Sequence, residues 1–297
     1  MTHRQATLAL VLTTVLWGFT FPAIKAVFLD MSPLLSVTAR FGIAGLLLAS
    51  TLRGASRREI EAGLVIGALF AIGVAFQNVG LEITTPSRSA FIVALSAVLT
   101  PAVGAGILGH RVDAGVVARL LVALAGVYLL TAPGGGLSGI NRGDWLTMVA
   151  AVVYAGHIVA VGHYTVGSST ARILSIQFLT TAALGVAGVL TVEPVRFQAT
   201  PRLFALLACL VGSIILTFTL QLRSQRVVTA SEAALIFTFE PVVAAGASYL
   251  VFGERLSAMQ MLGGLVILVA VGWPGTGRKG GKMITLGGRA RRDIQEP

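Results

Sequence analysis

Aromatic and basic side chains recur on one face of the first apolar segment of the sequence. Trp17, Phe21 and Lys25 are spaced four residues apart, and Phe28 follows three residues later, so in a helix they share one face. Aromatic rings beside an ammonium group would suit a cavity that stacks an apolar side chain and pairs with a carboxylate. The alternative is that the rings are packing or membrane-interface residues and that Lys25 extends outward to the polar boundary.

Hydroxyl and amide side chains form a second candidate surface on other apolar segments. Ser213, Thr217 and Gln221 are also four residues apart, and Gln77 with Asn78 occupies the equivalent level of an earlier segment. Polar side chains in hydrocarbon need hydrogen-bond partners and should face the protein interior. They either join helices to one another or offer hydrogen bonds to a zwitterionic substrate.

Two further residues of one apolar segment extend this surface. Tyr154 and His157 lie about one helical turn apart, so both can face the same interior space. An isolated buried histidine is more often a structural group, which is the alternative for His157. We predict that both residues contact substrate.

Glu240 is the acidic residue with the clearest potential for coupling. It lies about halfway along an apolar segment and precedes Pro241. A charged side chain at that depth costs roughly 2.5 to 3.5 kcal/mol on insertion scales, so it should be protonated, paired or water-accessible. Glu240 is therefore a candidate proton carrier. The alternatives are a pair with Arg40 and hydrogen bonds to backbone freed by Pro241.

The segments that carry these residues belong to a chain with too little charge for a water-soluble fold. Its residues are 55% hydrophobic and 11% charged, and the mean hydropathy is +0.87, whereas roughly 25% of an average soluble domain is charged. The apolar runs have the length of membrane spans. We predict an all-α integral membrane protein with ten transmembrane helices. The predicted spans are residues 6–28, 33–52, 60–82, 86–108, 114–132, 145–165, 170–192, 201–222, 228–252 and 258–273.

An internal repeat divides the predicted spans into two groups of five. A shift of 137 residues aligns the early spans of the two halves, and a shift of 144 residues aligns the later ones. An odd number of spans per repeat forces the two copies into opposite orientations. The predicted units are residues 1–137 and 138–274, followed by a basic, disordered cytoplasmic tail at 275–297. The pairs matched by the longer shift include Gln77 with Gln221, Thr85 with Thr229, Ser87 with Ser231, Gly109 with Gly253 and Arg111 with Arg255.

The distribution of Lys and Arg predicts the orientation. With the N-terminus inside, fourteen of these residues fall in inside loops and the tail and six in outside loops. Basic residues in short loops are retained on the cytoplasmic side. We therefore expect a multi-pass protein of the cell (inner) membrane with both termini in the cytoplasm.

Two stretches carry a resemblance to a known family. One runs from Phe239-Glu240-Pro241 to Gly253-Glu254-Arg255, and its weaker copy runs from Leu99-Thr100-Pro101 to Gly109-His110-Arg111. With the Leu16-Trp17-Gly18 opening, these stretches resemble the EamA-type permeases of the drug/metabolite transporter (DMT) superfamily over nearly the whole chain up to about residue 273. The chain departs from the pattern at His110, where the first repeat would usually carry Glu.

The resemblance implies a central cavity between two repeats and export or exchange of small organic solutes by alternating access. It also places the first helix at that cavity. Among such permeases the chain is most similar to the YddG-like amino-acid exporters, which implies amino acids, including aromatic or hydrophobic ones, as substrates. The expected partners are then a small-molecule substrate, the lipid bilayer and, if transport is coupled, protons.

Other classes of function have little support in the sequence. The basic residues lack the aromatic interleaving of a nucleic-acid surface, and one cysteine, Cys209, makes neither a disulfide framework nor a metal cluster. No G-x-S-x-G, H-E-x-x-H or Walker A motif occurs, so we expect neither an enzyme, nor a cofactor, nor an ATP-driven pump. A channel or a non-transporting scaffold is the alternative to a transporter. The sequence leaves the substrate, direction, coupling ion and oligomeric state open.

Overall fold

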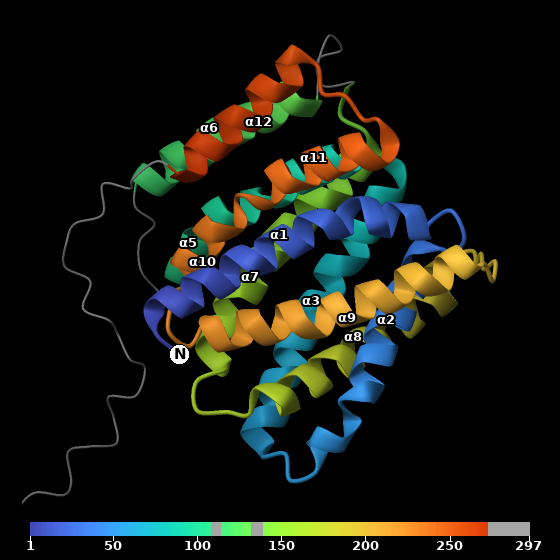
Figure 1. Ribbon diagram of the computed structural model, residues 1–297. Coiled ribbons are helices and arrows are strands. Elements are labelled where there is room, and N and C mark those ends of the chain that lie inside the picture. The colour runs from blue at the N-terminus through green and yellow to red at the C-terminus, as the bar shows by residue number, and fades with distance from the viewer. Residues whose placement is uncertain (108–113, 132–138, 273–297) are drawn as a thin grey trace, which may run out of the picture.

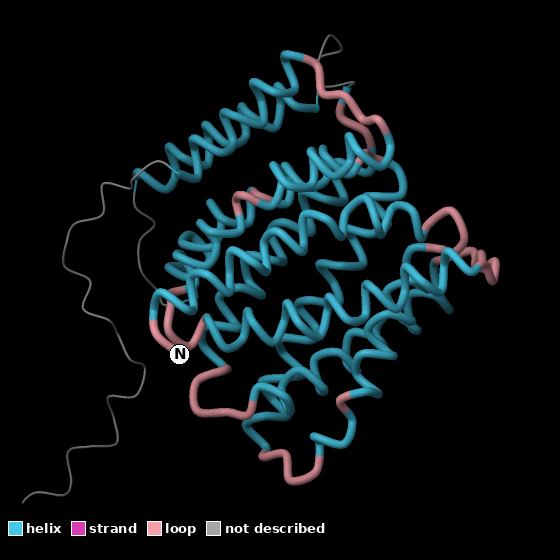
Figure 2. The backbone as a smooth tube through the Cα atoms, viewed as in Figure 1, coloured by secondary structure: helices cyan, strands magenta, loops and turns pink. Residues whose placement is uncertain are grey.

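The chain folds into a bundle of helices (Figure 1). The computed structural model describes residues 1–107, 114–131 and 139–272. Short loops join the helices (Figure 2), and within the described residues one isolated β-bridge pairs Met31 with Phe197. The helices are α1 (His3–Val27), α2 (Pro33–Leu47), the 3₁₀ helix η1 (Ala49–Leu52), α3 (Arg57–Ile83), α4 (Pro86–Val93), α5 (Leu95–Ile107), α6 (Ala114–Thr131), α7 (Arg142–Tyr164), α8 (Thr170–Val192), α9 (Pro201–Ser224), α10 (Ala230–Phe237), α11 (Glu240–Phe252) and α12 (Ala258–Gly272).

The helices have the length and composition of a multi-pass membrane protein. Seven described segments are long and apolar enough to cross a membrane, and three further apolar helices are shorter. All ten overlap a predicted span, so the all-α membrane class is confirmed, while ten crossings stay a prediction. The seven are α1, α3, α4 with α5, α7, α8, α9, and α10 with α11; the three shorter ones are Pro33–Leu47, Leu121–Leu130 and Ala258–Ala270.

Two predicted spans are each interrupted near the middle. Residues 228–252 contain α10 and α11, which are separated at Thr238 and Phe239. Pro241 explains this break, because it has no N–H for the carbonyl of Phe237 and its ring clashes with that carbonyl. Residues 86–108 contain α4 and α5, separated at Ala94. Proline does not explain the second break, since the proline of this span lies inside α5.

The helices that surround the interior come from both halves of the chain. α1 packs against α9 and α11, while α7 packs against α3 and α5. α2 packs against α8, and α6 and α12 lie side by side at one edge of the bundle (Figure 1). The interior space therefore has walls from both halves.

Close approach of α3 to α8 depends on glycine. A Cβ atom built on Gly63 would lie 2.5 Å from the Cβ of Ile176, and one built on Gly67 would lie 2.9 Å from the carbonyl oxygen of Gln177. Both distances are shorter than real contacts allow. The Gly63 and Gly67 pair thus acts as a small-residue interface of the kind common between membrane helices.

Replacing Gly63 with Leu should therefore destabilise the fold. Overpacking of this kind costs roughly 1 to 3 kcal/mol of unfolding free energy, because Ile176 and the backbone of α8 would have to move. Thermal unfolding of the purified protein in detergent measures the effect. Gly212→Leu is the matched control, since nothing lies within 4 Å of a Cβ at Gly212; equal destabilisation by both changes would contradict this account.

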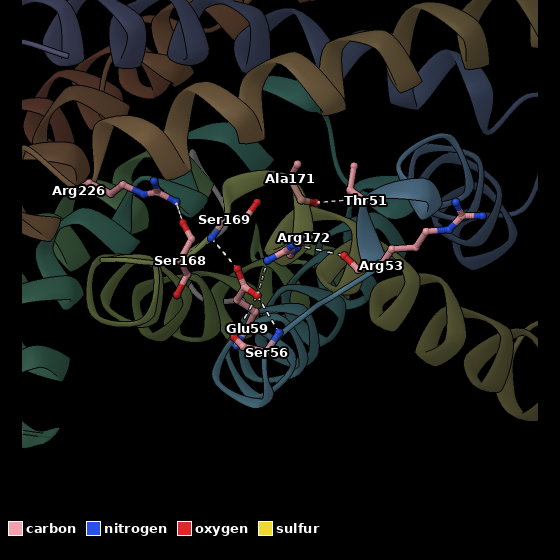
Figure 3. A network of polar contacts seen from close by, with 9 residues as sticks. All are labelled: Thr51, Arg53, Ser56, Glu59, Ser168, Ser169, Ala171, Arg172 and Arg226. Atoms are coloured by element: carbon pink, nitrogen blue, oxygen red, sulfur yellow. Dashed lines mark hydrogen bonds and ion pairs between the residues drawn. The ribbon is translucent and has the colours of Figure 1, made fainter.

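At one end of the bundle, Glu59 joins two helix N-termini (Figure 3). Its carboxylate accepts hydrogen bonds from the backbone N–H of Ser56 and of Ser169, both at 2.8 Å, and from Arg172 Nη1 at 3.3 Å. These residues begin α3 and α8, whose free N–H groups and dipoles favour a negative charge. Glu59 therefore fixes the start of α3 to the start of α8.

A second set of polar contacts lies between the α1–α2 and α8–α9 loops. Glu193 accepts hydrogen bonds from the backbone N–H of Leu34 at 2.7 Å and of Leu35 at 3.0 Å, at the start of α2. Arg202 donates to Asp30 at 2.8 Å, and these hydrogen bonds hold the pKa of Asp30 below its ordinary value. The Asp30 carboxylate therefore stabilises the folded state at neutral pH, and this stabilisation is lost as the pH falls through the lowered pKa of the folded state.

Candidate functional site

The interior contains a cavity of about 110 Å³ between helices from both halves. A comparable apolar cavity of roughly 150 Å³ binds benzene, so this volume suits a solute with one ring or an equivalent apolar group. Its walls combine aromatic rings with a few polar and charged groups. The lining residues are Trp17, Thr20, Phe21, Ile24, Arg40, Phe41, Phe70, Val74, Gln77, Val93, Ser96, Tyr154, His157, Ile158, Leu210, Ser213, Ile214, Thr217, Phe218, Gln221, Phe237 and Glu240.

Aromatic rings form a continuous cluster along this cavity. The ring of Trp17 lies 5.7 Å from that of Phe218 and 5.1 Å from that of Phe237, measured between centroids. Phe70 lies 4.8 Å from Phe218. Trp17 Nε1 also donates a hydrogen bond of 3.0 Å to Thr217 Oγ1, which fixes the orientation of the indole. Tilted rings at these separations can hold a further planar group.

Two buried polar side chains face this cavity without partners. Gln221 is 1% exposed and His157 is 3% exposed. Among the described residues, neither amide atom of Gln221 nor Nε2 of His157 has a hydrogen-bond partner. Leaving such groups unpaired costs free energy, and a bound solute or water can supply the missing bonds. Gln77, by contrast, accepts a hydrogen bond from the hydroxyl of Tyr154.

One cation and one carboxylate also line the cavity. Arg40 is 2% exposed and donates to the carbonyl of Ser36 at 3.1 Å and to Asn78 Oδ1 at 3.5 Å. Glu240 begins α11. The ion pairs of the described residues include none between Arg40 and Glu240, and no hydrogen bond joins Glu240 to the backbone freed by Pro241. Both structural alternatives for Glu240 are thus absent from this part of the chain.

Comparison with known proteins identifies the family. The model of the EamA-like transporter family matches residues 4–132 and again residues 141–273. The chain belongs to the EamA-like transporter family. An uncharacterized transporter of Archaeoglobus fulgidus is 32% identical over 270 residues, which are 90% of this chain and 84% of the relative. A crystal structure of a protein that is 22% identical superposes with a TM-score of 0.64, and the match covers 90% of this chain and 94% of the chain in that structure.

Membership of the EamA-like family defines the general function. The protein is a secondary transporter of the DMT type and not an enzyme, and it acts in a membrane on small molecules. At 22% identity, the similarity to the solved structure shows a shared fold and nothing about function. The resemblance found in the sequence is confirmed at the level of the family, and the YddG-like branch stays a prediction.

In this EamA-like transporter, most of the predicted site residues come together at the cavity. Trp17, Phe21, Gln77, Tyr154, His157, Thr217, Gln221 and Glu240 all line it. Lys25 and Asn78 do not. Lys25 Nζ donates to the carbonyls of Leu81, Glu82 and Thr84 at 2.7, 2.8 and 2.9 Å, where it satisfies the C-terminal end of α3. Asn78 bonds to the carbonyl of Val74 at 2.9 Å and to Arg40.

Several lining residues were not predicted from the sequence. Arg40 was considered only as a partner for Glu240, although an ionisable residue inside a membrane span indicates a functional site by default. The others include Phe41, Phe70, Phe218 and Phe237. Each is one apolar residue among many in its helix, so its residue type alone does not mark it as facing the cavity.

Proposed function

We propose that this EamA-like transporter exports or exchanges amino acids, including aromatic and hydrophobic ones, by alternating access around the central cavity. The observation that carries the proposal is the composition of that cavity. Both halves of the chain supply aromatic rings to one cavity, and the second half adds the polar groups of His157 and Gln221, which have no hydrogen-bond partner among the described residues. Such a site can stack an apolar side chain and bond to its polar groups. The YddG-like resemblance points to the same class of solute.

The helix bounds support two repeats of five helices. Under a shift of 144 residues, the breaks at Ala94 and Thr238 coincide. The family model also matches each half separately. These correspondences favour units at residues 1–137 and 138–274 with opposite orientations, although Gly109, His110, Arg111 and the tail at 275–297 lie outside the described residues. The same shift also matches residues that begin or end helices in the two halves: Arg57 with Pro201, Pro86 with Ala230, Val93 with Phe237, and Ala114 with Ala258.

Transport by the purified protein in liposomes tests the proposal. Uptake of labelled phenylalanine should saturate, and an excess of unlabelled phenylalanine inside the vesicles should accelerate it. Counterflow of this kind requires a carrier that returns with its substrate bound. Flux that rises linearly with concentration and shows no counterflow would favour a channel, and absence of flux for every amino acid would refute the substrate class.

The distribution of Lys and Arg predicts that both termini lie in the cytoplasm, and the loop contacts agree with its assignment of which loops share a side of the membrane. Arg58 Nη2 donates to the carbonyl of Val166, which joins two loops predicted to lie inside. The backbone N–H of Gln198 donates to the carbonyl of Asp30, which joins two loops predicted to lie outside. Residues assigned to the same side of the membrane are thus neighbours.

Cysteine labelling in intact cells should confirm this orientation. In a Cys209→Ser background, which removes the one native cysteine, an impermeant maleimide should label Gln198→Cys from outside the cell. Arg57→Cys should react only after the membrane is opened. Both positions are exposed. Labelling of both from outside would contradict the inverted arrangement, and the reversed pattern would place the termini outside.

A further inference from the structure

The cavity contains a buried cation that has no acidic partner in the part of the chain that the structure describes. Arg40 is among the largest fully buried side chains of the protein. Its guanidinium offers five N–H donors, and its hydrogen bonds within the described residues go only to two neutral oxygens, of Ser36 and Asn78. The longer of these, at 3.5 Å, is at the limit of a hydrogen bond. Buried charges in proteins are ordinarily paired, so the structure leaves a position for an anion.

The surroundings of Arg40 indicate what kind of anion fits. Its neighbour Phe41 lines the same cavity, and the ring of Phe41 lies 5.1 Å from that of Phe70. On α9, Gln221 lines this space with two amide atoms that have no partner within the described ranges. The site therefore combines a planar cationic fork, a neutral donor and acceptor, and an aromatic wall. A small inorganic anion would use the fork alone, whereas an organic carboxylate with an apolar body would use all three.

Lys25, the other cation considered for this purpose, is already occupied. Its ammonium group bonds to three carbonyl oxygens at the end of α3 and does not line the cavity. An ammonium group has three donors, so these bonds use its full capacity. Arg40 is therefore the lining cation that remains available within the described part of the chain.

We propose that Arg40 binds the carboxylate of the transported solute through paired N–H···O bonds, and that the site selects ring-bearing apolar carboxylates. This inference rests on the proposed function and deepens it, because it names the group by which the cavity recognises its substrate. Paired bonds between a guanidinium and a carboxylate are directional and among the stronger hydrogen bonds in proteins. Gln221 then contributes a further bond, and the aromatic wall holds the ring.

A matched set of solutes tests the inference on the unmodified protein. Phenylalanine, phenylalaninamide, phenylacetate and phenethylamine share one ring and differ in the carboxylate or the amine. Each is used to compete with labelled phenylalanine for uptake into proteoliposomes. The two carboxylates should compete at concentrations about tenfold to a hundredfold lower than the two solutes without a carboxylate, because one charge-assisted contact is lost.

Variants of Arg40 then assign the effect to this residue. In Arg40→Gln, the concentrations at which phenylalanine and phenylalaninamide compete should lie within about threefold of each other. Arg40→Lys should retain part of the preference, because it keeps the charge but loses the planar pair of N–H donors. Arg57→Gln removes an exposed arginine that pairs with Glu61, and it should leave the preference unchanged. Elution as a single species and an unaltered ligand-free melting temperature show which variants are folded. If Arg40→Gln does not fold, Arg40→Lys and the solute series of the parent protein decide the question.

The outcomes separate this inference from the proposed function. Saturable uptake with equal competition by acid and amide would overturn the role of Arg40 and leave the transporter intact. The role of Arg40 is also overturned if folded Arg40→Gln keeps the full preference for carboxylates. It is overturned as well if replacing chloride by gluconate weakens competition by all four solutes equally, since a resident inorganic anion would then occupy the guanidinium. Failure of every solute to compete or be transported would overturn both.

Discussion

Substituting Glu240 with Gln should abolish transport driven by a pH gradient while leaving exchange of substrate across the membrane intact. Glu240 is the one carboxylate among the lining residues of the cavity, and it has no ion pair within the described residues. A group that meets water from alternate sides can take up a proton on one side and release it on the other. Glutamine preserves the shape and hydrogen-bonding capacity of glutamate but cannot carry a proton.

The measurement is uptake into proteoliposomes with and without an imposed pH gradient, followed by counterflow at equal pH. Glu240→Asp should retain part of the gradient response, and Glu61→Gln, at an exposed carboxylate of α3, should behave as the parent does. The shift of 144 residues places Ser96 at the position equivalent to Glu240. The first half of the chain therefore has a neutral residue where the second half has an acid, so the architecture alone does not require an acid at this position. If Glu240→Gln follows a pH gradient as the parent does, Glu240 is not the proton carrier, and gradient-following facilitated transport becomes the better account.

Replacing Trp17 with Ala should reduce transport by about tenfold or more while leaving expression and folding largely intact. The indole touches Phe218 and Phe237 and donates to Thr217, so its removal takes one wall from the cavity. Loss of a buried aromatic contact at a binding site commonly costs about 2 kcal/mol or more, roughly thirtyfold in affinity. Initial rates over a range of phenylalanine concentrations measure the change.

Two controls separate loss of the binding surface from general damage. Trp17→Phe keeps an aromatic ring but loses the N–H donor, and it should have an intermediate rate. Phe19→Ala removes an aromatic side chain from the exposed face of the same helix, where Phe19 is 52% exposed, and it should transport normally. Gln221→Ala should also impair transport. Unchanged transport by both Trp17→Ala and Gln221→Ala would place the substrate elsewhere.

The sequence predicted the membrane class and eight of the residues that line the cavity for identifiable physical reasons. Long apolar runs specify spans because the bilayer excludes charge, and polar residues inside such runs must face the interior, which is where Thr217 and Gln221 lie. The break beside Pro241 follows from the missing N–H. The break at Ala94 has no comparable signal in its residues, because it lies seven residues before Pro101.

Tertiary contacts explain where the sequence reasoning failed to assign the cations. Lys25 shares a helix face with Trp17 and Phe21, as its spacing requires, yet the end of α3 lies within reach of its ammonium group. That neighbour comes from residues 56 to 59 positions away in the chain, and periodicity within one helix contains no information about it. Arg40 presented the opposite case, since the lack of an acid beside it among the described residues becomes visible only when the packed neighbours are known.

The paired interruptions at Ala94 and at Thr238 also bear on how the protein can move. One broken helix consists of α4 and α5, and the other of α10 and α11. α4 packs against α11, whereas α5 packs against α10, so the two halves of one broken helix contact different halves of the other. A change of tilt at either break can therefore be confined to one half of the broken helix. Under the proposed alternating access, half-helices that swivel about such points would widen the route to one compartment while the packing toward the other is kept, and the whole bundle would not have to move.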